Sequence, residues 1–147
     1  MSTCVHASCI AVENLGCLLL GPSGAGKSDL ALRLVMEHQA RLVADDQVAL
    51  ARRADRLVAS PPASLAGLIE VRGLGILRLS HRPRVTLGLA VVLVPPDEVE
   101  RLPEAEEGIE YLGVSLPLLR LAPFEASAPH KVRLAARLRK SSIRRRS

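Results

Sequence analysis

Short apolar runs separated by turn-forming residues recur along the chain, which is typical of β-strands joined by short loops. Residues 4–13 alternate loosely and predict a first strand, and residues 17–20 are continuously apolar. A further apolar run at 41–44 predicts a short buried strand that ends in two aspartates. Residues 85–94 are strongly apolar, which predicts a central strand of a sheet.

Two segments have helical patterns instead. Between about residues 26 and 38, apolar positions recur at Leu30, Leu34 and Val35. This spacing places them on one face of an amphipathic helix. Residues 127–140 predict a second, basic helix.

The remaining segments predict shorter β elements and loops. A hairpin is expected at 47–51 and 56–59, and a β-rich segment with two glycines at 68–79. An acidic, proline-containing loop is expected at 95–108, and another short strand within 112–121. Together these elements predict an α/β fold with a mixed sheet and flanking helices.

The composition indicates one domain, because a chain of 147 residues of which 48% are hydrophobic can bury a substantial core. No apolar run is long enough to span a bilayer and none resembles a signal peptide, so we expect a cytoplasmic protein with no membrane partner. The formal net charge is +5, but the basic excess lies near the C-terminus. We expect a domain over 1–139 and a disordered basic tail over 140–147. Nucleic-acid binding is not expected, because the body has no basic face with stacking aromatics.

A complete P-loop follows the apolar run at 17–20 and opens the first predicted helix. Its residues are Gly21, Pro22, Ser23, Gly24, Ala25, Gly26, Lys27 and Ser28. The glycines allow a tight turn whose N–H groups point at phosphate oxygens, and the helix N-terminus adds partial positive charge. Lys27 is expected to reach the outer phosphates, and the Ser28 hydroxyl to bind Mg²⁺.

Asp45 and Asp46 end the predicted strand at 41–44. If that strand neighbours the P-loop strand, both carboxylates reach the sheet edge that carries the phosphate site. On extended backbone the two side chains point in different directions, so one can face a metal and the other an attacking hydroxyl as its base. A solvated acidic turn is the alternative interpretation.

Glu70 and Arg72 flank Val71, and at a period of two they share one face of a strand. Side by side, a carboxylate and a guanidinium can hold a metal ion and a phosphate together. A surface ion pair fits the same spacing. His6 precedes the first predicted strand, and taken alone it indicates no function.

Four segments in order resemble the catalytic domain of the bacterial HPr kinase/phosphorylase family. They are His6, the P-loop, residues 41–46, and residues 68–76, which read Leu-Ile-Glu-Val-Arg-Gly-Leu-Gly-Ile and are similar to the family signature. The resemblance covers about residues 5–137. It implies a P-loop kinase domain with a fold like that of phosphoenolpyruvate carboxykinase, and assembly as a homo-hexamer.

The resemblance implies an enzyme that uses ATP, or pyrophosphate, and Mg²⁺ to phosphorylate a serine of HPr, the phosphocarrier protein of the sugar phosphotransferase system. It also implies the reverse reaction, in which inorganic phosphate removes the phosphoryl group and pyrophosphate is released. By position, Lys27 would contact nucleotide phosphates, and Ser28 and Glu70 would bind Mg²⁺. Asp46, next to Asp45, would take the serine proton.

The resemblance further implies that His6 assists Asp46, and that Arg72 lies in a signature needed for both directions. The chain departs from longer members at Tyr111, where they have an arginine, and at 128–131, where they have a Pro-Gly-Arg-Asn type loop. Lys131 can supply the missing cation there, but only as a point charge. Kinase activity is therefore the main expectation, and phosphorylase activity stays open.

The chain begins shortly before His6, so the resemblance implies a short form without the N-terminal domain of longer members, as is typical of alphaproteobacteria. Two other functions remain open from the residues. One is a P-loop kinase acting on a small molecule, for which a lid with several arginines is needed; the candidates are Arg78, Arg82 and Arg84. The other is a non-catalytic module that senses ATP.

Overall fold

The computed structural model describes the backbone of residues 1–146 and the side chains of residues 1–141. The strands are β1 (Ser2–His6), β2 (Ser8–Val12), β3 (Leu15–Leu20), β4 (Arg41–Ala44), β5 (Gln47–Arg53), β6 (Arg56–Ser60), β7 (Leu68–Val71), β8 (Gly75–Arg78), β9 (Val85–Leu93), β10 (Glu107–Tyr111) and β11 (Val114–Leu121). The helices are α1 (Lys27–Glu37) and α2 (Ala128–Arg146), with short 3-10 turns η1 (Ala63–Leu65) and η2 (Pro96–Glu98). The mixture of strands and helices confirms the predicted α/β class.

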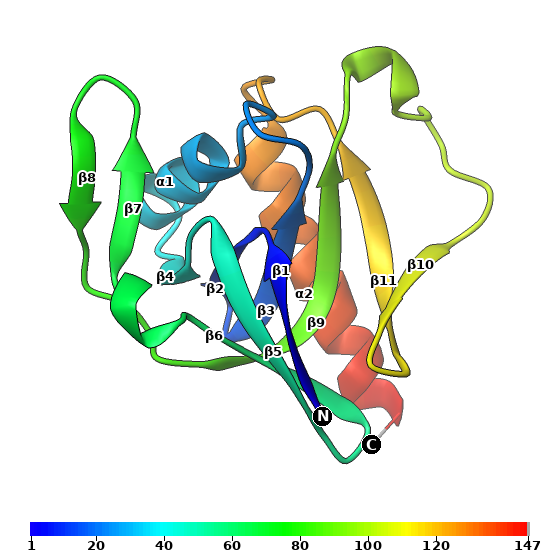
Figure 1. Cartoon of the computed structure of the whole chain (residues 1–147). Helices are drawn as coiled ribbons and strands as arrows, with labels where there is room; N and C mark the ends of the chain where they lie inside the picture. Colours follow the sequence, from blue (N-terminus) through cyan, green and yellow to red (C-terminus); the bar gives the residue numbers. More distant parts are fainter. Residues whose placement is uncertain (147) are drawn as a thin grey trace.

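Nine strands form one mixed sheet, with a path β1-β5-β6-β9-β3-β2-β4 and with β10 and β11 joined through β9. Strand β9 pairs with β3, β6 and β11, so the prediction of a central strand is confirmed. Its residues are almost all buried, which explains its continuous apolar sequence. The β7–β8 hairpin forms a separate small sheet and stands at one side of the molecule, opposite β10 (Figure 1).

Strand direction decides where the functional segments meet. Strand β2 is antiparallel to both β3 and β4, so β3 and β4 run in the same direction although β2 lies between them. The condition that these two strands are direct neighbours is therefore not met. Their carboxyl ends nevertheless lie at the same sheet edge, because two antiparallel pairings restore the direction.

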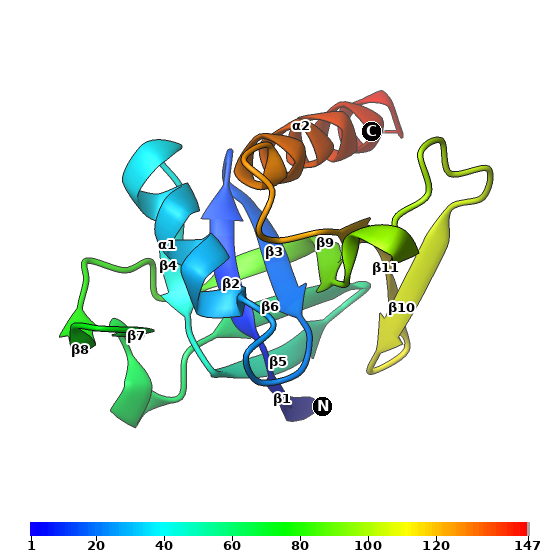
Figure 2. The ribbon, with the colours of Figure 1, turned by 90° about the horizontal axis from the view of Figure 1, so that it is seen from above.

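Helices α1 and α2 cover one side of the sheet, and the β1–β5–β6 part curls beneath the other (Figure 2). Each side has its own core. The first is formed by buried residues that include Ile10, Leu19, Leu30, Leu34, Val91, Val132 and Ala136. The second includes Leu18, Val48, Leu50, Leu57 and Ala90. The sheet is therefore buried on both faces, and α1 packs on β2 and β4.

Three predicted boundaries differ in the structure. The single strand expected over 4–13 is two strands that break at Ala7, whose N–H donates to the Asp46 carbonyl at 3.2 Å. Strand β10 begins inside the loop expected over 95–108; most of its residues are polar or glycine, and it pairs only with β11. Helix α2 continues to Arg146, through most of the segment expected as a disordered tail; Ser147 lies outside the described residues.

No helix within the described part of the chain is long and apolar enough to cross a membrane.

Candidate active site

The P-loop connects β3 to α1 as the sequence predicts. Gly24 and Gly26 have φ angles of 83° and 101°, in the left-handed region where only glycine is unstrained. Helix α1 begins directly afterwards, and the Leu30 N–H donates to the Gly26 carbonyl at 2.9 Å. The free N–H groups of the first helical turn therefore face the loop, where they can bind an anion.

Lys27 is buried against the loop from which it projects. Its Nζ donates to the carbonyls of Gly21 at 2.5 Å and Pro22 at 3.0 Å. Burial lowers the pKa of the Lys27 ammonium, and the nearby carboxylates of Asp46 and Asp45 oppose that shift. The lysine is thus held at the phosphate site before any phosphate binds.

Asp45 is the buried centre of the site, with only 6% of its surface exposed. It accepts hydrogen bonds from the Ser8 hydroxyl at 2.7 Å and from the Ser28 hydroxyl at 2.8 and 3.0 Å. The backbone N–H of Glu70 donates to its second oxygen at 3.2 Å. One carboxylate therefore ties together β2, the start of α1 and β7, and fixes Ser28 beside a negative charge.

Asp46 lines the P-loop cavity but is exposed, with 68% of its side-chain surface accessible. The prediction that both aspartates lie on extended backbone is wrong for Asp46. Asp46 has a φ of 68°, so a left-handed residue turns the chain between β4 and β5. The solvated acidic turn that was the alternative interpretation describes Asp46 and does not describe Asp45.

His6 lies beside Asp46, with its Nδ1 3.4 Å from Asp46 Oδ1. The register of β1 on β5 places His6 opposite Gln47, the residue that follows Asp46. Reasoning from residues alone gave His6 no role, because this contact depends on a strand pairing that local sequence does not encode. The family resemblance did single it out.

Glu70 and Arg72 line the same cavity as the P-loop, although Arg72 lies in the turn after β7 rather than on its face. The part of the chain with described side chains contains no ion pair between these two residues. The cavity measures about 480 Å³. Its lining comprises His6, Ser8, Ser23, Gly24, Gly26, Lys27, Ser28, Asp29, Leu32, Asp46, Glu70, Val71, Arg72 and Phe124.

Besides Ser8, which donates to Asp45, Phe124 is a lining residue that sequence reasoning missed. It belongs to the loop between β11 and α2, and no local motif marks it. Tyr111 and Lys131 do not line this cavity. Tyr111 packs against the second core, and burial raises the pKa of its hydroxyl. The Lys131 Nζ lies 3.9 Å from the Glu125 carboxylate.

The donor set fits a Mg²⁺ ion that is shared with a phosphate. Ser28 and Glu70 line the same cavity, and Asp45 contacts Ser28. Within the described residues no three His, Cys, Asp or Glu side chains cluster as a metal cage. Mg²⁺ needs no such cage, because it is commonly held by one or two carboxylates, water and substrate phosphates.

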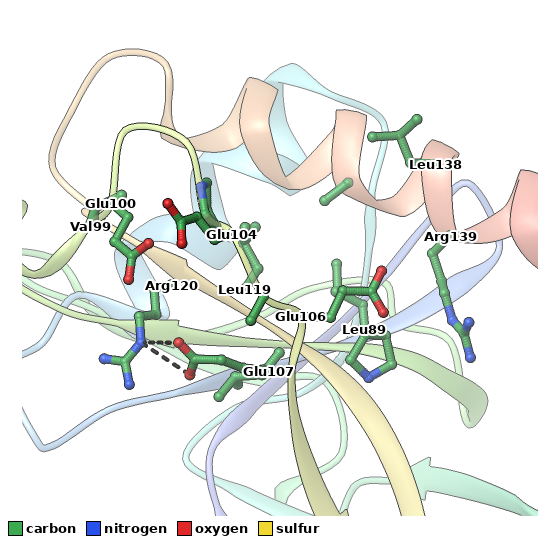
Figure 3. Close-up of a pocket in the computed structure, with 15 residues that line it drawn as sticks. Leu89, Val99, Glu100, Glu104, Glu106, Glu107, Leu119, Arg120, Leu138 and Arg139 are labelled. Carbon is green, nitrogen blue, oxygen red and sulfur yellow. Dashed lines mark hydrogen bonds and ion pairs between the residues drawn. The ribbon is translucent and has the colours of Figure 1, made fainter.

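A second hollow of about 400 Å³ lies between α2 and the β10–β11 side of the sheet (Figure 3). Four carboxylates line it, from Glu100, Glu104, Glu106 and Glu107. The Glu107 carboxylate pairs with Arg120 at 2.8 Å, which lowers the pKa of Glu107. This excess of negative charge disfavours phosphates, so the P-loop cavity is the candidate active site.

Comparison with known proteins identifies the family of this chain. The model of the HPr Serine kinase C-terminal domain matches residues 1–132. The HPr kinase/phosphorylase of Caldanaerobacter subterraneus subsp. tengcongensis is 38% identical over 128 residues, covering 80% of this chain and 42% of that protein. The HPr kinase/phosphorylase of Bordetella pertussis is 40% identical over 126 residues, covering 78% of this chain and 41% of that protein. The chain thus spans less than half the length of these curated relatives.

The fold is shared with a solved structure, that of the Hpr(Ser) kinase/phosphatase from Coxiella burnetii, with a TM-score of 0.85. The match covers 97% of this chain and 99% of that one, at 22% sequence identity, and it shows the fold. Since the family model matches most of the chain, from the first strand into α2, the assignment rests on sequence and fold together. The chain belongs to the HPr serine kinase C-terminal domain family.

Proposed function

We propose that this chain is a protein-serine kinase domain that transfers a phosphoryl group from ATP to a serine of HPr. The observation that carries the proposal is that two adjacent carboxylates have different surroundings. Asp45 is buried and accepts a hydrogen bond from Ser28 of the P-loop, whereas Asp46 is exposed and lies beside His6 in the same site. The names of the relatives support HPr as the acceptor.

The P-loop would bind the phosphates of the donor. Backbone N–H groups and the start of α1 offer hydrogen bonds and partial positive charge. Lys27 adds a full charge, and a phosphate oxygen would replace the carbonyls of Gly21 and Pro22 as its acceptor. Charge placed at the transferring group is the largest part of catalysis in phosphoryl transfer.

Ser28, Asp45 and Glu70 would hold Mg²⁺, which when bound neutralises charge on the outer phosphates. The hydrogen bonds between Ser28 and Asp45 orient both groups in advance. Asp45 therefore acts on the metal side of the site. Its burial and its three donors leave it unsuited to take a proton from a protein substrate.

Asp46 would act as the general base. Its exposed carboxylate can reach a serine hydroxyl on the surface of another protein, take its proton, and return it in the reverse direction. His6 would orient Asp46 from 3.4 Å. Arg72, in the same cavity, would offer a bidentate guanidinium to inorganic phosphate or pyrophosphate.

Two alternatives are less well supported. A small-molecule kinase needs arginines in a lid, but Arg78 donates to the Ala66 carbonyl and Arg82 to Asn14 and the Arg84 carbonyl. An ATP-sensing module needs no exposed base beside its phosphate site. We further propose that the chain works in the cytoplasm as a homo-oligomer, in the hexameric arrangement that the family resemblance implies.

The test is incubation of the purified protein with HPr of the same organism, ATP and Mg²⁺, followed by intact-mass measurement of HPr. A gain of one phosphoryl group is expected, and it should require Mg²⁺. Subsequent addition of inorganic phosphate tests phosphorolysis, which predicts loss of that mass and release of pyrophosphate. Binding of ATP with no transfer to HPr would contradict the kinase proposal and favour the sensing module.

A further inference from the structure

Phe124 is an exposed aromatic ring at the edge of a phosphate site. The chain contains one phenylalanine, one tyrosine and no tryptophan. The single phenylalanine is 71% exposed and lines the P-loop cavity. Its position brings an apolar, planar group within reach of whatever is attached to the bound phosphates.

The ring lies directly on the P-loop. A Cβ atom added to Gly26 would come within 2.9 Å of Phe124 Cζ and 3.0 Å of Cε1. The absence of a side chain at Gly26 therefore makes room for the ring as well as permitting the left-handed turn. The aromatic ring thus lies close to Gly26, the residue directly before α1.

The segment that carries the ring is fixed to α1. The Arg33 guanidinium donates to the carbonyl of Pro123, and its Nε pairs with Asp29 at 3.0 Å. The residues before Phe124 are buried, with Leu121 1% and Ala122 2% exposed. The helix that begins at the phosphate site therefore also sets the position of the ring, which is what a preorganised binding platform requires.

We propose that Phe124 is the stacking platform for the base of the nucleotide donor; this inference rests on the proposed function. Asp29 and Leu32, one helical turn apart on α1, line the cavity beside it. Phosphates bound at the start of α1 would leave the nucleoside next to Phe124 and Leu32. A phenyl ring offers a π face and no hydrogen bond, so it holds purine bases without distinguishing them.

A phosphate ligand that lacks the nucleobase is the decisive control for this proposal. Inorganic tripolyphosphate presents the phosphates of ATP without adenine or ribose, and it would bind the P-loop without touching Phe124. Replacement of Phe124 should therefore weaken the binding of ATP and leave the binding of tripolyphosphate unchanged. This difference separates a role in base binding from general damage to the loop.

The experiment measures the Kd of a non-hydrolysable ATP analogue and of tripolyphosphate, with Mg²⁺, by calorimetry. Phe124→Ala should raise the Kd of the ATP analogue about five- to a hundredfold, the range for loss of one base–aromatic stack. The Kd of tripolyphosphate should not change. Leu102→Ala, at a side chain that is 79% exposed and lies off this cavity, is the matched control and should change neither Kd.

Phe124→Trp should keep the Kd of the ATP analogue near that of the wild type and supply the only tryptophan of the chain. Its fluorescence should be quenched by the ATP analogue and not by tripolyphosphate. An unchanged Kd in Phe124→Ala, or an equal rise for both ligands, would overturn the stacking proposal. Failure of the wild type to bind either ligand would overturn the proposed function instead, so the two failures are distinguishable.

Discussion

The exchange of Asp45 for asparagine tests whether this carboxylate is the buried centre of the site. Its Oδ1 accepts from Ser8 and Ser28, and its Oδ2 from Ser28 and the Glu70 N–H. An asparagine has the same shape but one acceptor atom replaced by a donor. If its amide nitrogen turns toward Glu70, two N–H donors meet; if it turns toward Ser8, that hydroxyl proton loses its acceptor.

Either orientation leaves one buried donor without a partner, because Ser8 is 0% exposed and the Glu70 N–H is partly buried. Such a donor costs about 1–3 kcal/mol, and the lost charge assistance adds to it. Relief of the desolvation of a buried carboxylate offsets part of this cost. We expect Asp45→Asn to lower the free energy of unfolding by about 2 kcal/mol, which for a chain of this size lowers Tm by about 4–8 °C.

The assay is urea unfolding followed by circular dichroism, with a thermal melt as a second measurement. Asp46→Asn is the matched control, because its side chain is exposed and asparagine tolerates the left-handed φ of 68°. We expect it to change the free energy of unfolding by less than about 0.5 kcal/mol. Equal stability of Asp45→Asn and the wild type, or an equal loss in both variants, would refute the account of Asp45 given above.

Two further predictions concern titratable groups outside the site. Burial raises the pKa of Cys17 to about 12 and that of Cys9 well above its ordinary value, whereas Cys4 is exposed. At pH 8, iodoacetamide should therefore label the native protein once and the urea-unfolded protein at all three cysteines; rapid native labelling of a second cysteine contradicts the burial. Arg137 and Arg133 lower the pKa of Glu13, which joins them to the turn before β3. Because this pKa is lowered in the folded state, ionised Glu13 stabilises the protein at pH values above its ordinary pKa of 4.5. The stabilisation is lost as the pH falls below that value. In Glu13→Gln, the free energy of unfolding measured in urea should depend less steeply on pH below about 4.5. An unchanged dependence would show that Glu13 does not contribute to it.

Local sequence predicted the parts of the site that depend on local geometry. The P-loop requires glycines at fixed positions between a strand and a helix, and both elements formed where expected. The run at 41–44 became β4 and placed Asp45 at the end of a buried strand. Spacing sufficed in these cases because each element is determined by residues that are close in the sequence.

Long-range contacts were beyond such reasoning. His6 reaches Asp46 only through the pairing of β1 with β5, and Phe124 reaches Gly26 only through the path of the chain after β11. Strand β10 has little apolar pattern, because it depends on hydrogen bonds to β11 rather than on burial. The missed features thus share one cause, since register and crossover connections are fixed by tertiary packing.

A comparison of phosphoryl transfer with ATP binding in two variants tests whether Asp46 is the general base. Asp46→Asn should bind ATP with a Kd near that of the wild type, but transfer to HPr should fall about 10²–10⁴-fold, as for loss of a general base. Lys27→Ala should lose ATP binding itself, because the cation at the outer phosphates is removed. The measurement is the rate of mass gain by HPr at saturating ATP. Transfer by Asp46→Asn at the rate of the wild type would contradict the assignment of Asp46 as the base.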